Sequence, residues 1–378
     1  MKKIAIYGVG LYGRLFKAAL DANQGAIGNL VSFIDQFSPL ASVEDVPVER
    51  IDSVEDKAEI CVYISVALNE EIDDAGECLG TQIRQQLIKA GFEEVYDFAD
   101  AIKQIPGVLS RFPEQRLLWM HDDVSRMVNT EQIKKLEGLL SDETSRDLLK
   151  RIVAFRTSFD ARDYIRPDGQ EEYFPADVPI LRTIDSLRFV DAGAYIGDTV
   201  ASASEACRRA GTPIDFVASF EPDLDNIEKL SVEVEHQKKL SPEAKYFVYT
   251  SGVWSEDSLL TFSNDGNSSS TITTKRSQSN ISIAVNSLDS VLLGAAPNYI
   301  KMDIEGAERN AILGAKKIIQ AYRPVLAICI YHKPEDLWDL PLLIHSIEPN
   351  YDMSIRIHGH TGLSTVLYCL PNDKQKGQ

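Results

Sequence analysis

The sequence predicts an α/β protein with two Rossmann-like units, in which parallel strands alternate with helices. Three observations support this prediction. The chain has 378 residues, enough for two or three domains at roughly 150 residues each. Short apolar runs alternate with helical stretches in both the first and the second half of the chain. In each half, a glycine-rich turn follows the first strand, at Gly8–Gly13 and at Gly193–Gly197.

The first domain is expected to span residues 1–105. Its predicted strands are Lys3–Tyr7, Leu30–Asp35, Ile60–Val66 and Val95–Phe98, and its predicted helices are Arg14–Leu20 and Thr81–Ala90. Gly8, Gly10 and Gly13, with Asp35 about 20 residues further on, have the form of a dinucleotide-binding turn. The domain has fewer strands than the six of a full dinucleotide fold and no evident hydride-transfer residue. Nucleotide binding, nucleotide-sugar binding and a role in assembly therefore remain open.

Residues 106–180 are predicted to form a helical connector. Ser141–Thr144 can cap a helix over Arg146–Phe155, where apolar residues recur at helical spacing. Tyr164–Pro179 holds three prolines and mixed charges, so we expect an extended lead-in to the next domain.

A second β–α series occupies residues 181–378. Its predicted strands are Arg188–Asp191, Phe216–Phe220, Lys245–Tyr249, Tyr299–Asp303, Val325–Tyr331, Met353–Ile357 and Thr365–Cys369. The link Gly359–Leu363 is too short for a parallel crossover, so the last two strands should pair antiparallel at one sheet edge. The stretch Ser263–Ser282 is rich in Ser, Thr and Asn and is expected to be a mobile loop.

Composition narrows the range of partners. The net charge of −18 has the wrong sign for nucleic acid or for an anionic membrane surface. The longest apolar run, near Pro324–Tyr331, is far shorter than the roughly 20 residues of a membrane span. Glycines and Arg14 interrupt the apolar stretch at the N-terminus, so no export signal is expected. Homo-oligomerisation is left open.

Cysteine usage indicates a reducing compartment. The five cysteines are odd in number, widely spaced and without a C-x-x-C pair; they are Cys61, Cys78, Cys207, Cys329 and Cys369. We therefore expect a cytoplasmic protein whose cysteines are small core residues.

Two acidic residues at predicted strand ends suggest a nucleoside site. Asp191 ends one strand and is followed by the turn that holds Gly193 and Gly197. Glu221 ends the next strand, where a carboxylate can accept hydrogen bonds from both ribose hydroxyls. Glycines let the backbone turn tightly and approach a ligand.

These residues resemble the FkbM family of S-adenosylmethionine-dependent methyltransferases. The resemblance covers roughly residues 141–371, outside the N-terminal unit. It depends on the motifs Asp191-Ala-Gly-Ala-Tyr-Ile-Gly-Asp-Thr199, Phe220-Glu-Pro-Asp223, Tyr299-Ile-Lys-Met-Asp-Ile-Glu-Gly-Ala-Glu308, Leu313-Gly-Ala315 and Tyr331-His332. It implies a class I methyltransferase fold and O-methylation of a saccharide or related hydroxyl.

The resemblance also implies the donor site. The turn after the first strand would approach the methionine part of S-adenosylmethionine, Glu221 its ribose, and Ser251–Trp254 its adenine. The implied cofactor-binding residues are Asp191, Gly193, Ala194, Tyr195, Gly197, Thr199, Glu221, Asp223, Gly252 and Trp254. Tyr195 and Trp254 are equally compatible with a role as core aromatics.

Asp303, Glu305 and His332 are the candidate catalytic residues, because they follow neighbouring predicted strands where ligands of open α/β sheets collect. Two mechanisms compete. One of the three acts as general base while the others orient the acceptor, or all three bind a divalent cation, which is the less favoured hypothesis. Asp303 and Glu305 could instead cap the helix that begins near Gly306.

Three further features have less specific interpretations. Glu308 is interpreted as a helix residue rather than a catalytic one. Tyr173-Phe174 fits either a cover over the donor or simple packing. The spacing of His358-Gly-His360 could bind metal, but is more typical of a polar surface.

Two rival functions stay open. The N-terminal unit could drive an NAD-linked or nucleotide-sugar-modifying enzyme, with the second domain as a passenger. Alternatively, the chain could be a non-catalytic scaffold that binds glycans or nucleotides.

Overall fold

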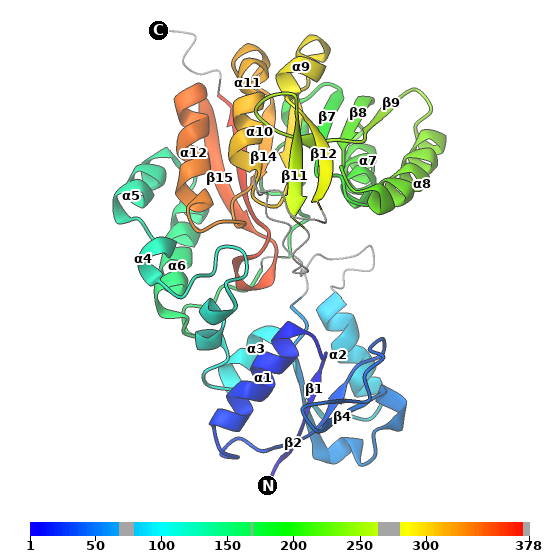
Figure 1. Cartoon of the computed structure of the whole chain (residues 1–378), viewed down its shortest axis with the longest axis vertical. Coiled ribbons are helices and arrows are strands. Elements are labelled where there is room, and N and C mark those ends of the chain that lie inside the picture. The colour runs from blue at the N-terminus through cyan, green and yellow to red at the C-terminus, as the bar shows by residue number, and fades with distance from the viewer. Residues whose placement is uncertain (68–78, 168, 264–279, 373–378) are drawn as a thin grey trace. The chain divides into compact units, whose positions relative to one another are not determined.

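The computed structural model describes residues 1–67, 79–167, 169–263 and 280–372 (Figure 1). The chain forms two compact units that interleave along the sequence. Unit 1 consists of Met1–Asn129, Asp147–Glu172 and Ile357–Thr365, and unit 2 consists of Thr130–Arg146, Tyr173–Arg356 and Val366–Gln378. The domain boundaries expected near residues 105 and 180 stay a prediction.

Unit 1 is built on a sheet with the strand order β3-β4-β2-β1-β5-β6. The strands are β1 (Lys3–Tyr7), β2 (Asn29–Ile34), β3 (Ser42–Val43), β4 (Val46–Glu49), β5 (Ile60–Ile64) and β6 (Glu94–Tyr96). All neighbouring pairs are parallel except β3 and β4. From β1 the chain first extends the sheet through β2 and β4 and then returns to the other side through β5. The change of direction lies between β1 and β5, where ligands of open α/β sheets bind.

The two helices predicted for the first domain are present, but a third, unpredicted helix spans Phe98–Gln104, so Phe98 does not end a strand as expected. The helices of unit 1 are α1 (Leu11–Ala22), α2 (Leu79–Lys89), α3 (Phe98–Gln104), α4 (Val124–Met127) and α6 (Glu143–Ser158), the last of which begins in unit 2. The helical character expected for much of residues 106–180 is therefore present in the described part of that region.

The two histidines of the pair His358 and His360 lie inside unit 1, not on its surface. Both are buried, with exposed fractions of 3% and 5%. His360 Nδ1 lies 2.5 Å from the hydroxyl of Tyr164, and His358 Nδ1 lies 3.1 Å from the carbonyl of Gln170. The expectation of a polar surface was wrong, because both rings are needed as packed hydrogen-bonding groups.

Unit 2 contains a larger sheet with the order β15-β16-β14-β13-β7-β8-β9. Its strands are β7 (Leu187–Ala192), β8 (Ile214–Phe220), β9 (Lys245–Tyr249), β13 (Tyr299–Met302), β14 (Val325–Cys329), β15 (Tyr351–Ile357) and β16 (Thr365–Pro371). β16 runs antiparallel to β14. The seven predicted strands and the predicted edge location of the last two are confirmed.

The helices of unit 2 form two groups (Figure 1). They are α5 (Thr130–Leu139), α7 (Asp198–Ala210), α8 (Leu224–Leu240), α9 (Leu288–Leu292), α10 (Glu308–Gly314), α11 (Lys316–Tyr322) and α12 (Asp336–Ile347). α7 and α8 pack on each other and on β7–β9, whereas α10, α11 and α12 pack on one another.

A small second sheet in unit 2 was not predicted. It has the order β10-β12-β11, formed by β10 (Gly252–Val253), β11 (Ser258–Ser263) and β12 (Asn280–Asn286). β11 and β12 pair antiparallel, so the ends of the expected Ser263–Ser282 loop are strand residues. Residues 264–279 of that loop lie outside the described residues.

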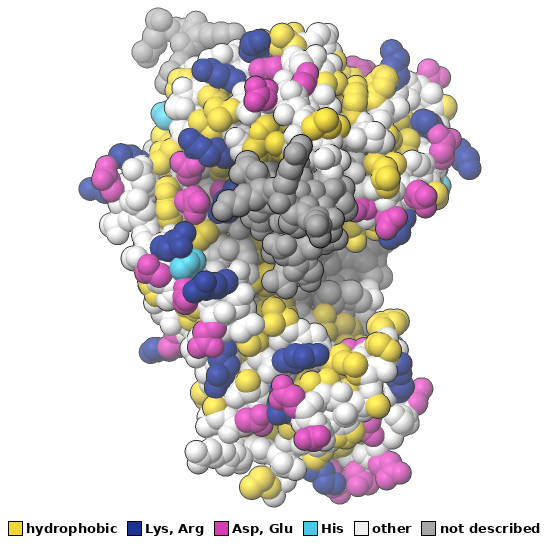
Figure 2. Space-filling model, in the orientation of Figure 1, with side chains coloured by type: hydrophobic (Ala, Val, Ile, Leu, Met, Phe, Trp, Pro, Cys, Tyr) yellow, Lys and Arg dark blue, Asp and Glu magenta, His cyan; other side chains and the backbone are white. Residues whose placement is uncertain are grey.

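The cores are apolar, as the strand pattern predicts. Four cysteines, Cys61, Cys207, Cys329 and Cys369, are buried and form no disulfide among the described residues, while Cys78 lies outside the described residues. Among the described helices, none combines the length and apolar character required to cross a bilayer. On the face shown in Figure 2, acidic and basic side chains are interspersed over both units.

Candidate functional site

Four neighbouring strands of unit 2 end at one edge of the sheet, and the candidate residues follow those ends. Ala192 of β7 is in register with Met302 of β13 and with Phe220 of β8. The next residues along the chain, Gly193, Asp303 and Glu221, therefore leave the sheet at the same level. The chain order reverses between β7 and β13, so this edge holds the switch point of unit 2.

The turn after β7 packs directly on Asp303. Gly193 has φ +80°, and a Cβ placed on it would lie 1.8 Å from the carbonyl oxygen of Asp303. The N–H groups of Gly193 and Ala194 each donate to the carbonyl of Phe220 at 3.0 Å. Gly197, with φ +94°, then begins α7. Only glycine permits this approach at position 193, because any side chain would overlap the backbone of β13's extension.

Glu221 fixes the same turn through its carboxylate. Its Oε2 accepts a hydrogen bond from the Tyr195 N–H at 3.0 Å, and its Oε1 accepts one from the Asp223 N–H at 2.9 Å. The Asp223 side chain instead caps α8. Tyr195 has a φ of +47° and is 53% exposed, so it is not a core aromatic. Oε1 also accepts a hydrogen bond from Asn226 Nδ2 at 3.4 Å, so about one of the roughly four acceptor positions of the carboxylate remains for a ligand hydroxyl.

Two buried serine hydroxyls without a hydrogen-bond partner in the described chain lie in β8 and in the turn after β9. Ser251, after β9, and Ser219, within β8, are buried, and neither hydroxyl has a hydrogen-bond partner among the described residues. Gly252 lies in β10, and the Trp254 N–H donates to the Asn286 carbonyl at 2.9 Å. Trp254 is partly exposed rather than a fully buried core residue.

Three of the predicted donor-site residues lie too deep to offer their side chains freely. Thr199 is buried in α7, Ala194 has no exposed surface, and Asp191 is fully buried in β7. Asp191 pairs with Lys301, the residue beside it in β13, with Oδ1 and Nζ 3.1 Å apart. We therefore retain Asp191 in the site as the partner of Lys301.

The Asp191–Lys301 pair is electrostatically unusual. Burial raises the pKa of Asp191 to about 6, although the charge of Lys301 acts in the opposite direction. Burial alone would lower the pKa of Lys301, but the charges of Asp191 and Asp303 hold it above its ordinary value. Lys301 is thus a buried cation, and its place in the site was not predicted from the sequence.

Asp303 lies at the centre of the candidate site. Its Oδ2 accepts a hydrogen bond from the Tyr173 hydroxyl at 2.9 Å, and its Oδ1 accepts one from the Tyr331 hydroxyl at 3.4 Å. Burial would raise the pKa of Asp303, but the neighbouring His332 and Lys301 hold it well below the ordinary range. Asp303 is therefore a carboxylate at neutral pH, and Tyr173 contacts this acid.

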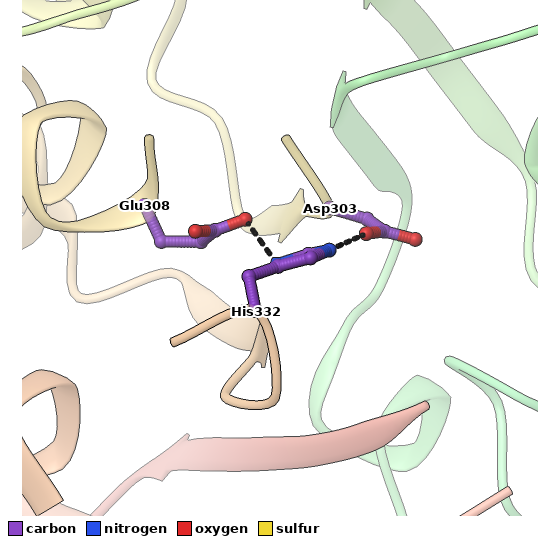
Figure 3. Close-up of side chains that lie close together, drawn as sticks. All are labelled: Asp303, Glu308 and His332. Carbon is purple, nitrogen blue, oxygen red and sulfur yellow. Dashed lines mark ion pairs between the residues drawn. The ribbon is translucent and has the colours of Figure 1, made fainter. Parts of the chain in front are cut away.

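His332 lies between two carboxylates (Figure 3). Its Nε2 is 3.2 Å from Asp303 Oδ1, and its Nδ1 is 3.0 Å from Glu308 Oε1. Neither ring nitrogen has a directed hydrogen bond among the described residues. Burial would lower the pKa of His332, but Glu308 and Asp303 raise it well above the ordinary value. The charges of Asp303 and Glu308 hold the ring between them. Nε2 forms no directed hydrogen bond with Asp303 and can still bond to another group.

Glu308 belongs to this cluster, which its interpretation as a helix residue alone did not anticipate. It begins α10, is 1% exposed, and its Oε1 accepts a hydrogen bond from the Ile304 N–H at 2.9 Å. Its spacing of five residues from Asp303 was visible in the sequence, but its distance from His332 depends on how β13 and β14 pair.

Glu305 is exposed at the mouth of the cluster. Its φ is +55°, and the following Gly306 has φ +91°. This turn leaves Glu305 Oε2 3.9 Å from His332 Nε2. The cap of α10 is Ala307, without a side-chain hydrogen bond, so neither Asp303 nor Glu305 caps the helix. That alternative was wrong, because the two acids turn toward His332 instead.

Asp303, Glu308 and His332 are close enough for each to offer one ligand atom to a metal ion. The imidazole, however, lies between the two carboxylates and would bind a cation through only one nitrogen (Figure 3). A cation at Nε2 would leave Glu308 behind the ring, as an orienting carboxylate. The arrangement therefore favours a carboxylate–imidazole–carboxylate relay over a centre with all three as ligands.

Similarity to known proteins indicates a methyltransferase domain within the chain. Residues 191–352 match the family model described as the Methyltransferase FkbM domain. The chain contains a methyltransferase FkbM domain. This domain is a methyltransferase domain, and it includes every residue assigned above to the candidate site except Tyr173. A search of curated proteins finds no match.

One solved structure is similar in fold to nearly the whole chain. The crystal structure of Methyltransferase FkbM from Methylobacillus flagellatus KT matches 98% of this chain and 90% of that chain, with TM-score 0.59 and 21% identity. The predicted α/β fold class is confirmed. The citrinin polyketide synthase CMeT domain matches 65% of this chain and 57% of that chain, at 11% identity and a TM-score of 0.27, which is too low to indicate a shared fold.

Proposed function

We propose that the protein transfers a methyl group from S-adenosylmethionine to a hydroxyl of a saccharide or related metabolite. The observation that carries this proposal is the edge of the unit 2 sheet. There, the glycine turn and Glu221 lie beside Asp303, at the switch point of a methyltransferase domain. The class of acceptor rests on the family resemblance.

The residues at this edge fit an adenosyl donor. Glu221 follows β8, and its buried carboxylate keeps about one acceptor position for a ribose hydroxyl. The buried hydroxyls of Ser219 and Ser251 have no partner within the described chain, and such groups are costly unless something binds them. The donor supplies an electrophilic methyl group. The protein has to position an acceptor oxygen and remove its proton.

His332 is proposed as the general base. Its Nδ1 side lies against Glu308, and a buried carboxylate in that place fixes the orientation of the ring and stabilises its charged form. Nε2 is left facing the side of Asp303, where an acceptor hydroxyl can approach. His332 loses its proton more readily beside a cationic donor, because like charges disfavour the imidazolium.

Asp303 and Glu305 are proposed to orient the acceptor. Asp303 is ionised and is held by Tyr173 and Tyr331, so it can accept a hydrogen bond from the reacting hydroxyl. Glu305 is exposed beside it and can accept a second one. We also propose a cytoplasmic location, which is supported by the absence of disulfides among the four described cysteines.

Calorimetric titration tests the proposal most directly. Binding of S-adenosylhomocysteine to the full chain is expected, together with weaker binding in Glu221→Ala. Heat with NAD(H) and none with S-adenosylhomocysteine would instead favour an enzyme driven by unit 1. Donor binding without slow donor turnover in any acceptor mixture would favour a scaffold.

A further inference from the structure

Lys301 is a buried cation for which the proposed reaction has no use. It lies in the middle of β13 and is 2% exposed. A charged side chain is almost never buried unless it is paired and hydrogen-bonded. Its contacts should therefore reveal what it does.

The Lys301 ammonium group lies against the glycine turn. Its Nζ donates a hydrogen bond to the Gly193 carbonyl at 2.6 Å and pairs with Asp191 Oδ1 at 3.1 Å. Gly193 is the residue whose Cα packs on the Asp303 carbonyl. The Gly193 turn is thus contacted twice: Lys301 binds the Gly193 carbonyl, and the backbone of Asp303 packs against Gly193 itself.

The same ammonium group also faces the acceptor side. It lies 5.2 Å from the centroid of the Tyr173 ring, within the range of a cation–π contact. The Tyr173 hydroxyl donates to Asp303 at 2.9 Å. One buried cation therefore contacts both the turn proposed to bind the donor and the tyrosine that holds the acid proposed to bind the acceptor.

We propose that Lys301 is a positioning residue that sets the glycine turn in its donor-binding conformation, with Asp191 as its counter-ion. This inference rests on the proposed function for the identity of the donor. It does not require Lys301 or Asp191 to touch donor or acceptor.

The test needs a variant that keeps the fold. Lys301→Met alone leaves Asp191 as an unpaired buried charge and is expected to destabilise the protein. The double variant Asp191→Leu with Lys301→Met removes both charges, and such replacements by apolar residues are often neutral or stabilising. A matched control is Glu205→Gln with Arg208→Gln, which removes an exposed ion pair of α7.

The first measurement is the affinity for S-adenosylhomocysteine. In the folded double variant, with Tm close to wild type, we expect the dissociation constant to rise about tenfold, as the loss of one hydrogen bond predicts. The control should bind like wild type. Unchanged affinity in the folded double variant would overturn the inference.

The second measurement needs no donor. Hydrogen exchange of the Gly193, Ala194 and Gly197 amides in ligand-free protein reports whether the turn is held. Faster exchange in the double variant than in the control is expected, and equal exchange would overturn the inference. If wild type does not bind S-adenosylhomocysteine, the proposed function fails, and exchange still decides the role of Lys301.

Discussion

The two units use the same backbone device at their switch points and differ in the chemistry around it. In unit 1, Asp35 after β2 accepts a hydrogen bond from the Val9 N–H at 3.2 Å. In unit 2, Glu221 after β8 accepts one from the Tyr195 N–H at 3.0 Å. In both units, an acid following the second strand therefore holds the glycine turn that follows the first.

The two units differ in the strand that lies on the other side of the switch point, β5 in unit 1 and β13 in unit 2. Ser65, after β5, donates to the carbonyls of Tyr7 and Gly8 at 2.8 and 3.2 Å. In unit 2, the Gly193 carbonyl is held by the charged side chain of Lys301, which lies within β13, two residues before the position that corresponds to Ser65. A neutral hydroxyl is enough to hold a glycine turn. The charges of unit 2 thus point to a further task, which we assign to catalysis and positioning.

The sharpest test of this comparison removes the imidazole of unit 2. His332→Gln is expected to lower the rate of donor turnover by about 10²–10⁴-fold, the usual contribution of a general base. Ser65→Ala in unit 1 removes a buried hydroxyl at the equivalent edge and should leave the turnover rate close to wild type. The release of S-adenosylhomocysteine measures both. Equal losses in the two variants would contradict the division of labour.

The second test concerns the two strand-end acids. Glu221→Ala should weaken S-adenosylhomocysteine binding by about 1.5–3 kcal/mol for each ribose hydrogen bond lost to a charged acceptor. Asp35→Ala loses the same kind of backbone contact in unit 1 and should not change that affinity. Titration calorimetry of both variants decides. Unchanged affinity in Glu221→Ala would remove Glu221 from the donor site.

The third test compares glycines of unit 2 that share a positive φ but differ in their surroundings. Gly211→Ala strains only the backbone, at roughly 1–2 kcal/mol, because a Cβ there meets open space. Gly193→Ala adds the overlap with the Asp303 carbonyl, so its loss of unfolding free energy should exceed about 2 kcal/mol. Urea unfolding measures the difference. Equal losses would show that the turn can move away from Asp303.

The sequence was sufficient for the strands but not for the contacts across them. Apolar runs located the seven strands of the large sheet, and polar residues that follow strands indicated Glu221, Asp303 and His332 as site candidates. In the sequence, Lys301 is a single charged residue within an apolar strand. Its contacts with Asp191 and the Gly193 carbonyl follow only from the pairing of β13 with β7.

Two other contacts depend on tertiary structure in the same way. Tyr173 reaches Asp303 across 130 residues of sequence, and no local pattern encodes that distance. Glu308 meets His332 only because β13 and β14 are adjacent and parallel. β11 and β12 were not predicted, because they pair with each other in a separate small sheet. The alternation of strands and helices that locates the strands of the large sheet does not extend to them.

The smallest expected effect is a pH dependence that belongs to unit 2. The pKa of His332 is raised in the folded protein, so its stabilising contribution is complete below the unfolded value of about 6.5 and is lost as pH rises through the folded pKa. For one proton, the free energy of unfolding can change by up to about 1.4 kcal/mol per pH unit. The turnover rate should rise over the same range, because a general base acts only when deprotonated.

The variant His332→Gln lacks the imidazole, so the difference in unfolding free energy between wild type and variant reports the titration of His332. The unfolding free energy of wild type minus that of the variant should shrink from pH 6 toward alkaline pH, and Ser65→Ala should follow wild type throughout. Asp336 titrates in the same direction, since burial raises its pKa to about 7, but it is present in all three proteins. A difference between wild type and His332→Gln that stays constant with pH would mean that the clamp between Asp303 and Glu308 does not favour the imidazolium. The switch points of unit 2 and unit 1 would then differ in their residues but not in a stability that depends on pH.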